Sequence, residues 1–223
     1  MCFCLYSSKL CNDEIIRYVD LTELRPFATK EEIDSLCRDA IKYRCASVCI
    51  PPSYVKYVKS KYGSKTSICT VIGFPLGYQT TETKLYEVKN AVMDGADELD
   101  VVVNIGKVKD KDYTFVAKEL SLIKEASEKQ VLKVIIETCY LKEEEIINLC
   151  KIISELKIDY IKTSTGFGTA GANLNDIRVM KHNLYNGVKI KAAGGIKNKE
   201  QMEEYINEGC QRLGSSSAVK ALF

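Results

Sequence analysis

Eight short apolar runs, rich in β-branched residues, recur along the 223 residues of this chain and constrain its fold more than any other feature. They begin about 20 to 33 residues apart, which is the length of one strand followed by one helix. The runs are residues 18–21, 46–50, 67–72, 98–103, 131–137, 160–163, 188–192 and 212–214. This alternation predicts an α/β fold built from eight strand–helix units.

Helical patterns fill most of the intervals between the runs. Thr29 followed by Glu31 and Glu32 is typical of a helix start, and Gly209 is typical of a helix end. Apolar residues recur at helical spacing in the same stretches. The expected helices are residues 29–43, 83–93, 111–128, 142–156, 175–184 and 199–208.

Several runs are apolar on both faces, as in residues 101–103 and 134–136. Such strands suit a parallel sheet that is covered by helices. Because no linker or second composition block interrupts the pattern, we expect one domain over residues 1–223, a (β/α)₈ (TIM) barrel with a short N-terminal extension. An open doubly wound sheet is the alternative, because residues 212–214 form the weakest strand pattern.

Composition excludes several classes of function. Lys and Arg total 32 and Asp and Glu total 30, so the net charge of +2 gives no basic excess for nucleic acid. No apolar run is long enough to span a membrane. The ten cysteines include no C-x-x-C pair and follow no signal peptide, which favours buried thiols in a reducing cytoplasm. The single histidine, His182, disfavours a Ser–His–Asp triad or an all-histidine zinc site.

Three runs carry a charged residue near the carboxyl end of the predicted strand, where barrel enzymes place their catalytic groups: Asp100, Lys162 and Lys191. A lone charge is costly to bury unless it is paired. Strand alternation would group charges on shared faces: Glu98 with Asp100, Lys133 with Glu137, and Lys189 with Lys191. The charges form either structural ion pairs, the better interpretation for Lys133 and Lys189, or an active site.

Two facing lysines near an aspartate favour Schiff-base chemistry. An amine must lose its proton before it attacks a carbonyl, and both a neighbouring cation and partial burial lower the pKa of a lysine. Lys162 and Lys191 fit such a pair, in which one lysine attacks and the other perturbs it.

Glycine and serine follow the last two predicted strands. Gly194 and Gly195 follow the seventh, and Gly214 precedes a serine run that includes Ser216 and Ser217. Glycine lets the backbone approach an anion, and barrels often bind phosphate at these two loops, beside a short final helix. We therefore expect a phosphate site there.

The segment G-F-G-T-A-G at residues 166–171 matches the dinucleotide-binding fingerprint literally. The residue twenty positions further on is Lys191 rather than an acid that could bind a ribose hydroxyl. We interpret the segment as a flexible glycine-rich loop over the site rather than a nicotinamide site.

Seven segments occur in a fixed order between about Asp20 and Ser217: V-D-L-T-E-L-R-P, S-V-C-I-P-P, V-I-G-F-P-L-G, D-E-L-D-V-V-V-N-I-G, L-K-V-I-I-E-T, D-Y-I-K-T-S-T-G-F-G-T-A-G-A and V-K-I-K-A-A-G-G-I. Together they resemble the signature segments of the deoxyribose-phosphate aldolase family. The combination of I-K-T-S-T-G with a later K-A-A-G-G is the most specific part of the resemblance.

The resemblance implies a class I aldolase without metal or cofactor, a dimer or tetramer with no nucleic-acid or membrane partner. Its reaction would be the reversible cleavage of 2-deoxy-D-ribose 5-phosphate to D-glyceraldehyde 3-phosphate and acetaldehyde, in deoxyribonucleotide catabolism. Lys162 would form the Schiff base, and Lys191 would activate it and assist proton transfer. Asp100 would be the other acid/base group, acting with an ordered water, and Asp20 and Thr22 would belong to the same proton relay.

The resemblance also assigns the phosphate to the glycine–serine loops already described: Gly194, Gly195, Gly214, Ser216 and Ser217. Three positions depart from many relatives. Leu21 replaces a histidine and Gly73 an asparagine, and neither touches the lysine–lysine–aspartate set. Phe167 stands where some relatives have a phosphate-contacting lysine, which leaves that contact open.

Two alternatives share part of the pattern. A different Schiff-base barrel, such as a transaldolase-like enzyme or a dehydratase, would share Lys162 but not the pairing of the two motifs. A sugar-phosphate-binding barrel without activity would keep the phosphate loops, yet it has no need for two lysines at strand ends.

Overall fold

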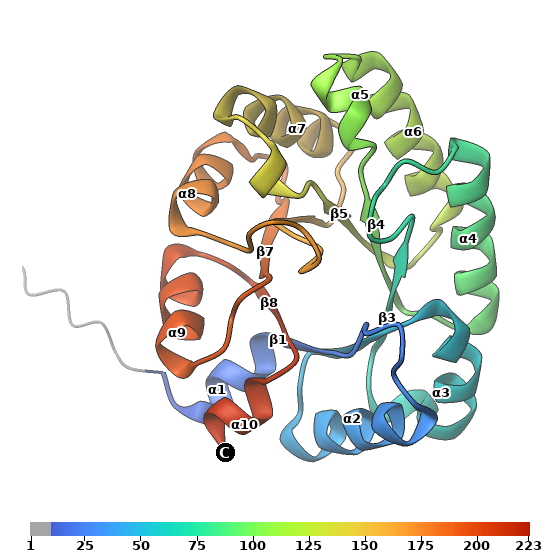
Figure 1. The fold of residues 1–223 in the computed structure, drawn as a ribbon, viewed down its shortest axis with the longest axis vertical. Helices are drawn as coiled ribbons and strands as arrows, with labels where there is room; N and C mark the ends of the chain where they lie inside the picture. The colour runs from blue at the N-terminus through green and yellow to red at the C-terminus, as the bar shows by residue number, and fades with distance from the viewer. Residues whose placement is uncertain (1–9) are drawn as a thin grey trace, which may run out of the picture.

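Eight parallel strands close into one barrel in chain order in a computed structural model that describes residues 10–223 (Figure 1). Pairing of the last strand with the first, with Leu213 beside Val19, completes the closure. The predicted (β/α)₈ barrel is therefore confirmed, and the open doubly wound sheet is excluded. The strands are β1 (Val19–Thr22), β2 (Ser47–Ile50), β3 (Ile68–Ile72), β4 (Glu98–Val102), β5 (Val131–Ile135), β6 (Tyr160–Lys162), β7 (Lys189–Ala193) and β8 (Arg212–Ser215).

Helices form a ring outside the strands (Figure 1). All six predicted helices are present, with ends within two residues of those expected; α1, α3 and α5 were not predicted. The short N-terminal extension contains α1 and a 3₁₀ turn at Ile16–Tyr18 that packs against α10. The helices are α1 (Asn12–Ile15), α2 (Lys30–Tyr43), α3 (Val55–Tyr62), α4 (Thr81–Asp94), α5 (Ile105–Lys109), α6 (Tyr113–Ala126), α7 (Glu143–Glu155), α8 (Leu174–Asn183), α9 (Lys199–Glu208) and α10 (Ala218–Leu222).

Local sequence signals fix several element ends. Thr29 and Glu32 form a reciprocal capping box at the start of α2, with the Thr29 amide 2.8 Å from the Glu32 carboxylate. Gly209 ends α9 at a φ of 114°, a left-handed conformation that glycine adopts without a steric penalty. Strand β5 ends two residues earlier than predicted, because Glu137 takes a left-handed conformation with a φ of 52°.

Apolar helix faces cover the barrel and form the core. Ile33, Val88, Leu120, Ile153 and Met180 come from five different helices, and each is fully buried. Burial of such side chains is the main favourable contribution to folding. The strands themselves are buried on both faces, as a parallel sheet requires.

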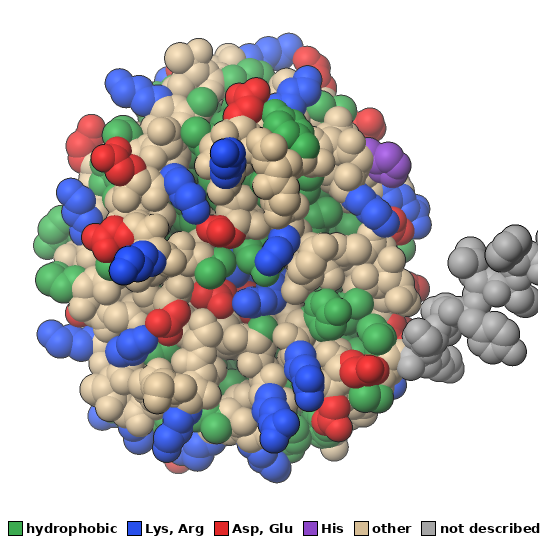
Figure 2. Space-filling view, turned by 180° about the vertical axis from the view of Figure 1, so that it is seen from behind, with side chains coloured by type: hydrophobic (Ala, Val, Ile, Leu, Met, Phe, Trp, Pro, Cys, Tyr) green, Lys and Arg blue, Asp and Glu red, His purple; other side chains and the backbone are tan. Residues whose placement is uncertain are grey.

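The outer surface mixes charges of both signs. Figure 2 shows acidic and basic side chains interspersed over one face, with hydrophobic side chains scattered between them. His182 lies exposed on α8, as predicted. Within residues 10–223, no helix combines the length and the apolar character needed to cross a membrane.

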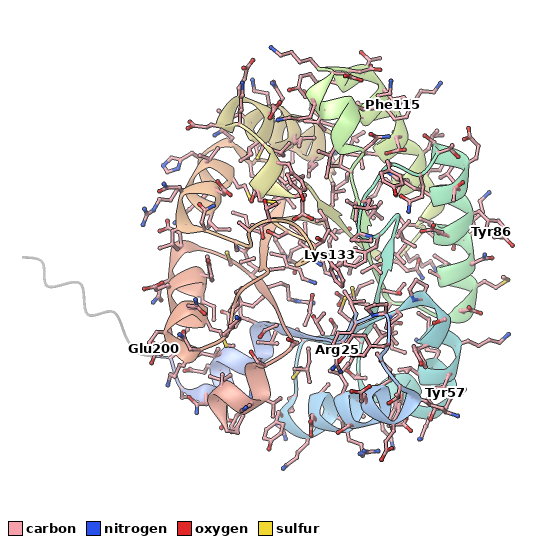
Figure 3. All side chains as sticks on the ribbon, viewed as in Figure 1. Arg25, Tyr57, Tyr86, Phe115, Lys133 and Glu200 are labelled. Atoms are coloured by element: carbon pink, nitrogen blue, oxygen red, sulfur yellow. The ribbon has the colours of Figure 1, made fainter. Side chains whose placement is uncertain are left out.

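Strand register brings the charged strand residues together. Asp100 pairs in register with Lys133 on β5, and Lys191 on β7 lies between Lys162 on β6 and Arg212 on β8. Neighbouring strands lie roughly 4.8 Å apart, so long side chains on these residues meet inside the barrel. Figure 3 shows Lys133 at the centre of the molecule, whereas Tyr57, Tyr86 and Glu200 lie on the outer helices.

Candidate active site

Seven ionisable residues form an interior charge cluster within the barrel. Each of them makes at least one ion pair with another member of the cluster. The side chains of six are at most 4% exposed, and that of the seventh, Arg212, is 17% exposed. The members are Asp20, Glu98, Asp100, Lys133, Lys162, Lys191 and Arg212.

Asp100 lies at the centre of this interior charge cluster. Its Oδ2 atom accepts hydrogen bonds from the Nζ atoms of Lys162 at 2.7 Å and Lys191 at 2.8 Å. Its Oδ1 atom accepts from Lys133 Nζ at 2.8 Å and from the Cys69 thiol at 3.1 Å. The two lysines of the predicted Schiff-base pair therefore share one carboxylate oxygen.

Asp20 connects the far side of the cluster. Its carboxylate pairs with Lys191 and, at 2.6 Å, with Arg212, and lies 3.8 Å from Lys133. The Thr22 hydroxyl donates to the backbone carbonyl of Asp20 at 2.8 Å, not to its carboxylate. Asp20 and Thr22 are thus close together, but only Asp20 belongs to the ion-pair network.

The charges of the cluster hold one another in their ionised forms. Burial alone would raise the pKa of the Asp100 carboxyl, but Lys133, Lys162 and Lys191 outweigh it and hold that pKa well below its usual range. Asp20 is likewise buried, and the cations around it lower its pKa. Burial alone would lower the pKa of Lys191, yet Asp100 and Asp20 raise it above the ordinary value.

The cluster contains one more cation than it has carboxylates. Three carboxylates face four cations, and Lys162 pairs with Asp100 alone, whereas Lys191 pairs with both Asp20 and Asp100. Lys162 is therefore the cation of the cluster that pairs with the fewest carboxylates, and removing its charge would leave every carboxylate with another partner.

These pKa shifts predict how the stability of the fold depends on pH. Asp20 and Asp100 have lowered pKa values in the folded state, so their contribution is present above about pH 4 and is lost as the pH falls through the folded pKa. Lys191 has a raised pKa, so its contribution is present below about pH 10.4 and is lost as the pH rises further. Urea midpoints measured from pH 3 to pH 11 should decline at both ends.

A flat urea midpoint between pH 7 and pH 3 would contradict this assignment. Asp110 provides the control, because it is exposed and lies outside the cluster. Asp110→Asn should leave the acid-side slope as it is in the unmodified protein.

A cavity of about 840 Å³ opens beside the cluster. Of the three interior lysines, only Lys162 lines it; Lys133 and Lys191 lie behind and are fully buried. Thr22 also lines the cavity, as does Arg25 on the segment after β1 (Figure 3). The geometry thus presents one lysine amine to a bound molecule and keeps the other two in the protein interior.

The five residues predicted to bind phosphate all line the same cavity as Lys162. Gly194 and Gly195 have φ angles of 84° and 77°, a left-handed backbone that places no side chain between their amides and the cavity. We call the wall formed by these five the glycine–serine wall: Gly194, Gly195, Gly214, Ser216 and Ser217.

Sequence reasoning missed two cations at the edge of this wall. Lys197 and Lys220 line the cavity, and neither makes an ion pair with any carboxylate of the described residues. Lys197 follows the Gly194–Gly195 pair by only two residues, so its place beside the predicted phosphate loop could have been inferred from the sequence. Lys220 lies on α10, so its proximity emerges only from the fold.

Two charges predicted to share a face with the cluster lie elsewhere. Lys189 begins β7 and is exposed, with its ammonium 5.6 Å from the Tyr160 ring centre. Glu137 lies beyond the end of β5 and contacts Thr165 instead of Lys133. Lys133, interpreted as structural, makes three ion pairs with Asp20, Glu98 and Asp100 inside the cluster.

One group of side chains has donor atoms at metal-binding spacing. The Cys49 and Cys69 sulfurs and an Asp100 oxygen lie within 4.8 Å of one another. However, Lys133 Nζ lies 3.3 Å from the Cys69 sulfur and 2.8 Å from Asp100 Oδ1. A divalent cation there would be repelled by Lys133, Lys162 and Lys191, whose ammonium groups already bond to the Asp100 carboxylate. These three side chains therefore do not fit a metal site.

The chain matches the family model described as DeoC/LacD family aldolase over residues 14–218. The chain belongs to this family of aldolases. A protein from Clostridium botulinum named deoxyribose-phosphate aldolase is 52% identical over 211 residues, covering 95% of this chain and 96% of that protein. A protein of the same name from Thermococcus kodakarensis is 49% identical over 212 residues, covering 93% and 95%.

Solved structures of aldolases share the fold of this DeoC/LacD family member. An aldolase named QR15 has a TM-score of 0.90 and 38% identity, covering 94% of each chain. A deoxyribose phosphate aldolase from Aeropyrum pernix, described as a unique tetrameric structure, has a TM-score of 0.86 and 30% identity, covering 96% of this chain and 92% of that one. The family resemblance drawn from the sequence is therefore confirmed.

Proposed function

We propose that this chain is a deoxyribose-phosphate aldolase that cleaves 2-deoxy-D-ribose 5-phosphate reversibly through a Schiff base on Lys162. One observation carries the assignment of the site. Lys162 is the interior lysine that reaches the cavity, and the glycine–serine wall lines the same cavity. A phosphorylated aldehyde could thus bind its phosphate at the wall and present its carbonyl to the amine. The relatives from C. botulinum and T. kodakarensis carry the same activity in their names.

The proposed chemistry begins when neutral Lys162 adds to the C1 aldehyde of the open-chain sugar, and the adduct takes up a proton from the solvent and loses water, forming a protonated imine. The imine takes up the electron pair of the C2–C3 bond as that bond breaks. A base removes the proton of the C3 hydroxyl, so D-glyceraldehyde 3-phosphate leaves. The remaining enamine gains a proton at C2, and water then hydrolyses the imine to acetaldehyde, the neutral amine and a proton.

The cluster supports proton transfer in this proposal. Lys191 is held as a cation by Asp20 and Asp100, so it can donate a hydrogen bond near the imine and stabilise nearby negative charge. Asp100 remains ionised and contacts Lys162, so it can exchange protons with substrate through a bound water. Asp20 extends the relay from Lys191, and Thr22 borders it on the cavity side with its hydroxyl bonded to the Asp20 backbone carbonyl.

Trapping with borohydride tests the Schiff base and separates the alternatives. Acetaldehyde plus borohydride should leave a reduced two-carbon adduct on Lys162, located by peptide mass spectrometry. Cleavage of 2-deoxyribose 5-phosphate, followed through the release of glyceraldehyde 3-phosphate, then distinguishes this enzyme from a transaldolase-like enzyme or a dehydratase. A folded protein that yields neither adduct nor cleavage product would be a binding barrel instead.

We also propose a cytoplasmic homo-oligomer, a dimer or tetramer. Each of the eight cysteines in the described part of the chain is a free thiol, and five of these are buried, which suits a reducing compartment. Cys2 and Cys4 lie outside the described residues. The tetrameric relative from A. pernix supports self-association, which sedimentation or light scattering of the purified protein measures directly.

A further inference from the structure

Glu137 is a buried acid that the proposed reaction does not use. Its side chain belongs to a residue that is only 2% exposed, and no lysine or arginine of residues 10–223 makes an ion pair with it. An unpaired buried carboxylate is costly. Its backbone adds a second cost, because a non-glycine residue at a φ of 52° is strained. Because both the buried carboxylate and the left-handed backbone are unfavourable, we looked for a role of Glu137 in its contacts.

The side-chain hydrogen bonds of Glu137 both go to the loop that follows Lys162. Its carboxylate accepts hydrogen bonds from the Thr165 amide at 3.1 Å and from the Thr165 hydroxyl. The Thr165 hydroxyl oxygen in turn accepts from the Phe167 amide at 3.0 Å. Gly168 packs directly on this acid, since a Cβ there would lie 3.1 Å from Glu137 Cδ. Glu137 thus fixes the loop that follows Lys162.

That loop lines the cavity next to the glycine–serine wall. Thr165, Gly166 and Phe167 line the cavity. The end of the loop approaches the wall so closely that a Cβ on Gly171 would lie 2.1 Å from the Gly194 carbonyl oxygen. The Ala172 amide also donates to that oxygen, at 3.2 Å. The loop position therefore sets the shape of the wall.

We propose that Glu137 is a positioning residue for substrate phosphate, acting through Thr165 on the loop at residues 163–171. The inference rests on the proposed function, because that function supplies the phosphate. The charge-assisted hydrogen bonds that a carboxylate accepts from two donors of one residue are stronger than neutral ones. They hold the loop against the glycine–serine wall before substrate binds, so binding does not have to order it.

Glu137→Gln tests this role, because the new amide nitrogen cannot accept a bond from either donor of Thr165. We expect the KM for 2-deoxyribose 5-phosphate to rise by about tenfold or more, with a much smaller change in kcat. The KM for unphosphorylated 2-deoxyribose should be unchanged. Glu128→Gln is the matched control, since Glu128 is an exposed glutamate with a φ of 50°.

Thr165→Val provides the second variant. It removes the hydroxyl that links Glu137 to the Phe167 amide, so it should raise the same KM, and the double variant should be no worse than the poorer single variant. An unchanged KM in Glu137→Gln, or equal losses with both sugars, would overturn the proposal.

Hydrogen exchange at the Thr165 and Phe167 amides should accelerate in Glu137→Gln and gives a readout independent of activity. If these amides exchange as slowly in Glu137→Gln as in the unmodified protein, Glu137 does not position the loop. This outcome would overturn the positioning role whether or not the unmodified protein cleaves 2-deoxyribose 5-phosphate.

Discussion

Lys162→Met should reduce cleavage of 2-deoxyribose 5-phosphate by a factor on the order of 10⁵, because it removes the proposed nucleophile and leaves a side chain of similar length. The variant should also fail to form a borohydride-stable adduct with acetaldehyde. Both losses follow from one atom, since Lys162 Nζ is the interior amine presented to the cavity.

The charge balance of the interior predicts that this variant still folds. Removing Lys162 leaves three cations and three carboxylates in the interior charge cluster, so no buried carboxylate loses its last partner. The thermal midpoint of Lys162→Met should therefore stay at or above that of the unmodified protein. Lys151→Met, an exposed lysine on α7, serves as the control for activity. Normal turnover by folded Lys162→Met would remove Lys162 from the proposed mechanism.

The fold followed from sequence because its determinants are local. A strand of β-branched residues and a capped amphipathic helix each leave their own pattern, and eight repeats leave little choice of architecture. The α3 helix was missed because its lysine-rich sequence, Val55–Tyr62, lacks a strong start signal: its N-cap residue, Tyr54, makes no side-chain capping bond.

The central part of the candidate site was also predictable. Asp100, Lys162 and Lys191 stand out because a charge inside a β-branched run demands a partner. Parallel register then places Lys162 beside Lys191. This pairing was predictable because the two motifs lie on consecutive strands of the chain. The glycine–serine wall was recognised from its position after the last two strands.

The rest of the site depends on contacts that no sequence pattern encodes. Arg212 reaches the cluster because barrel closure brings β8 beside β1, and nothing in its local sequence marks that. Glu137 was placed on the wrong partner because strand alternation fails once its backbone turns left-handed. Lys84 on α4 and Glu119 on α6 form a buried ion pair 2.8 Å apart. In the sequence, each looks like an ordinary surface residue, so the pair could not be predicted.

Lys191→Leu should lower kcat by a factor on the order of 10² to 10⁴, the range contributed by a positioned proton donor. Lys191 pairs with both Asp20 and Asp100, so the leucine also removes one cation from each of these buried carboxylates. Release of glyceraldehyde 3-phosphate from 2-deoxyribose 5-phosphate measures the loss of activity.

A loss of activity in Lys191→Leu is informative only if the barrel remains folded. Removing one partner of a buried ion pair costs about 3 to 5 kcal/mol, so the variant should be assayed well below its thermal midpoint. Inorganic phosphate should still protect it against thermal unfolding, because the glycine–serine wall does not include Lys191. Lys189→Leu, on the same strand but exposed, should behave like the unmodified protein. Unchanged turnover would exclude Lys191 from the chemistry and leave it as a structural cation that balances Asp20 and Asp100.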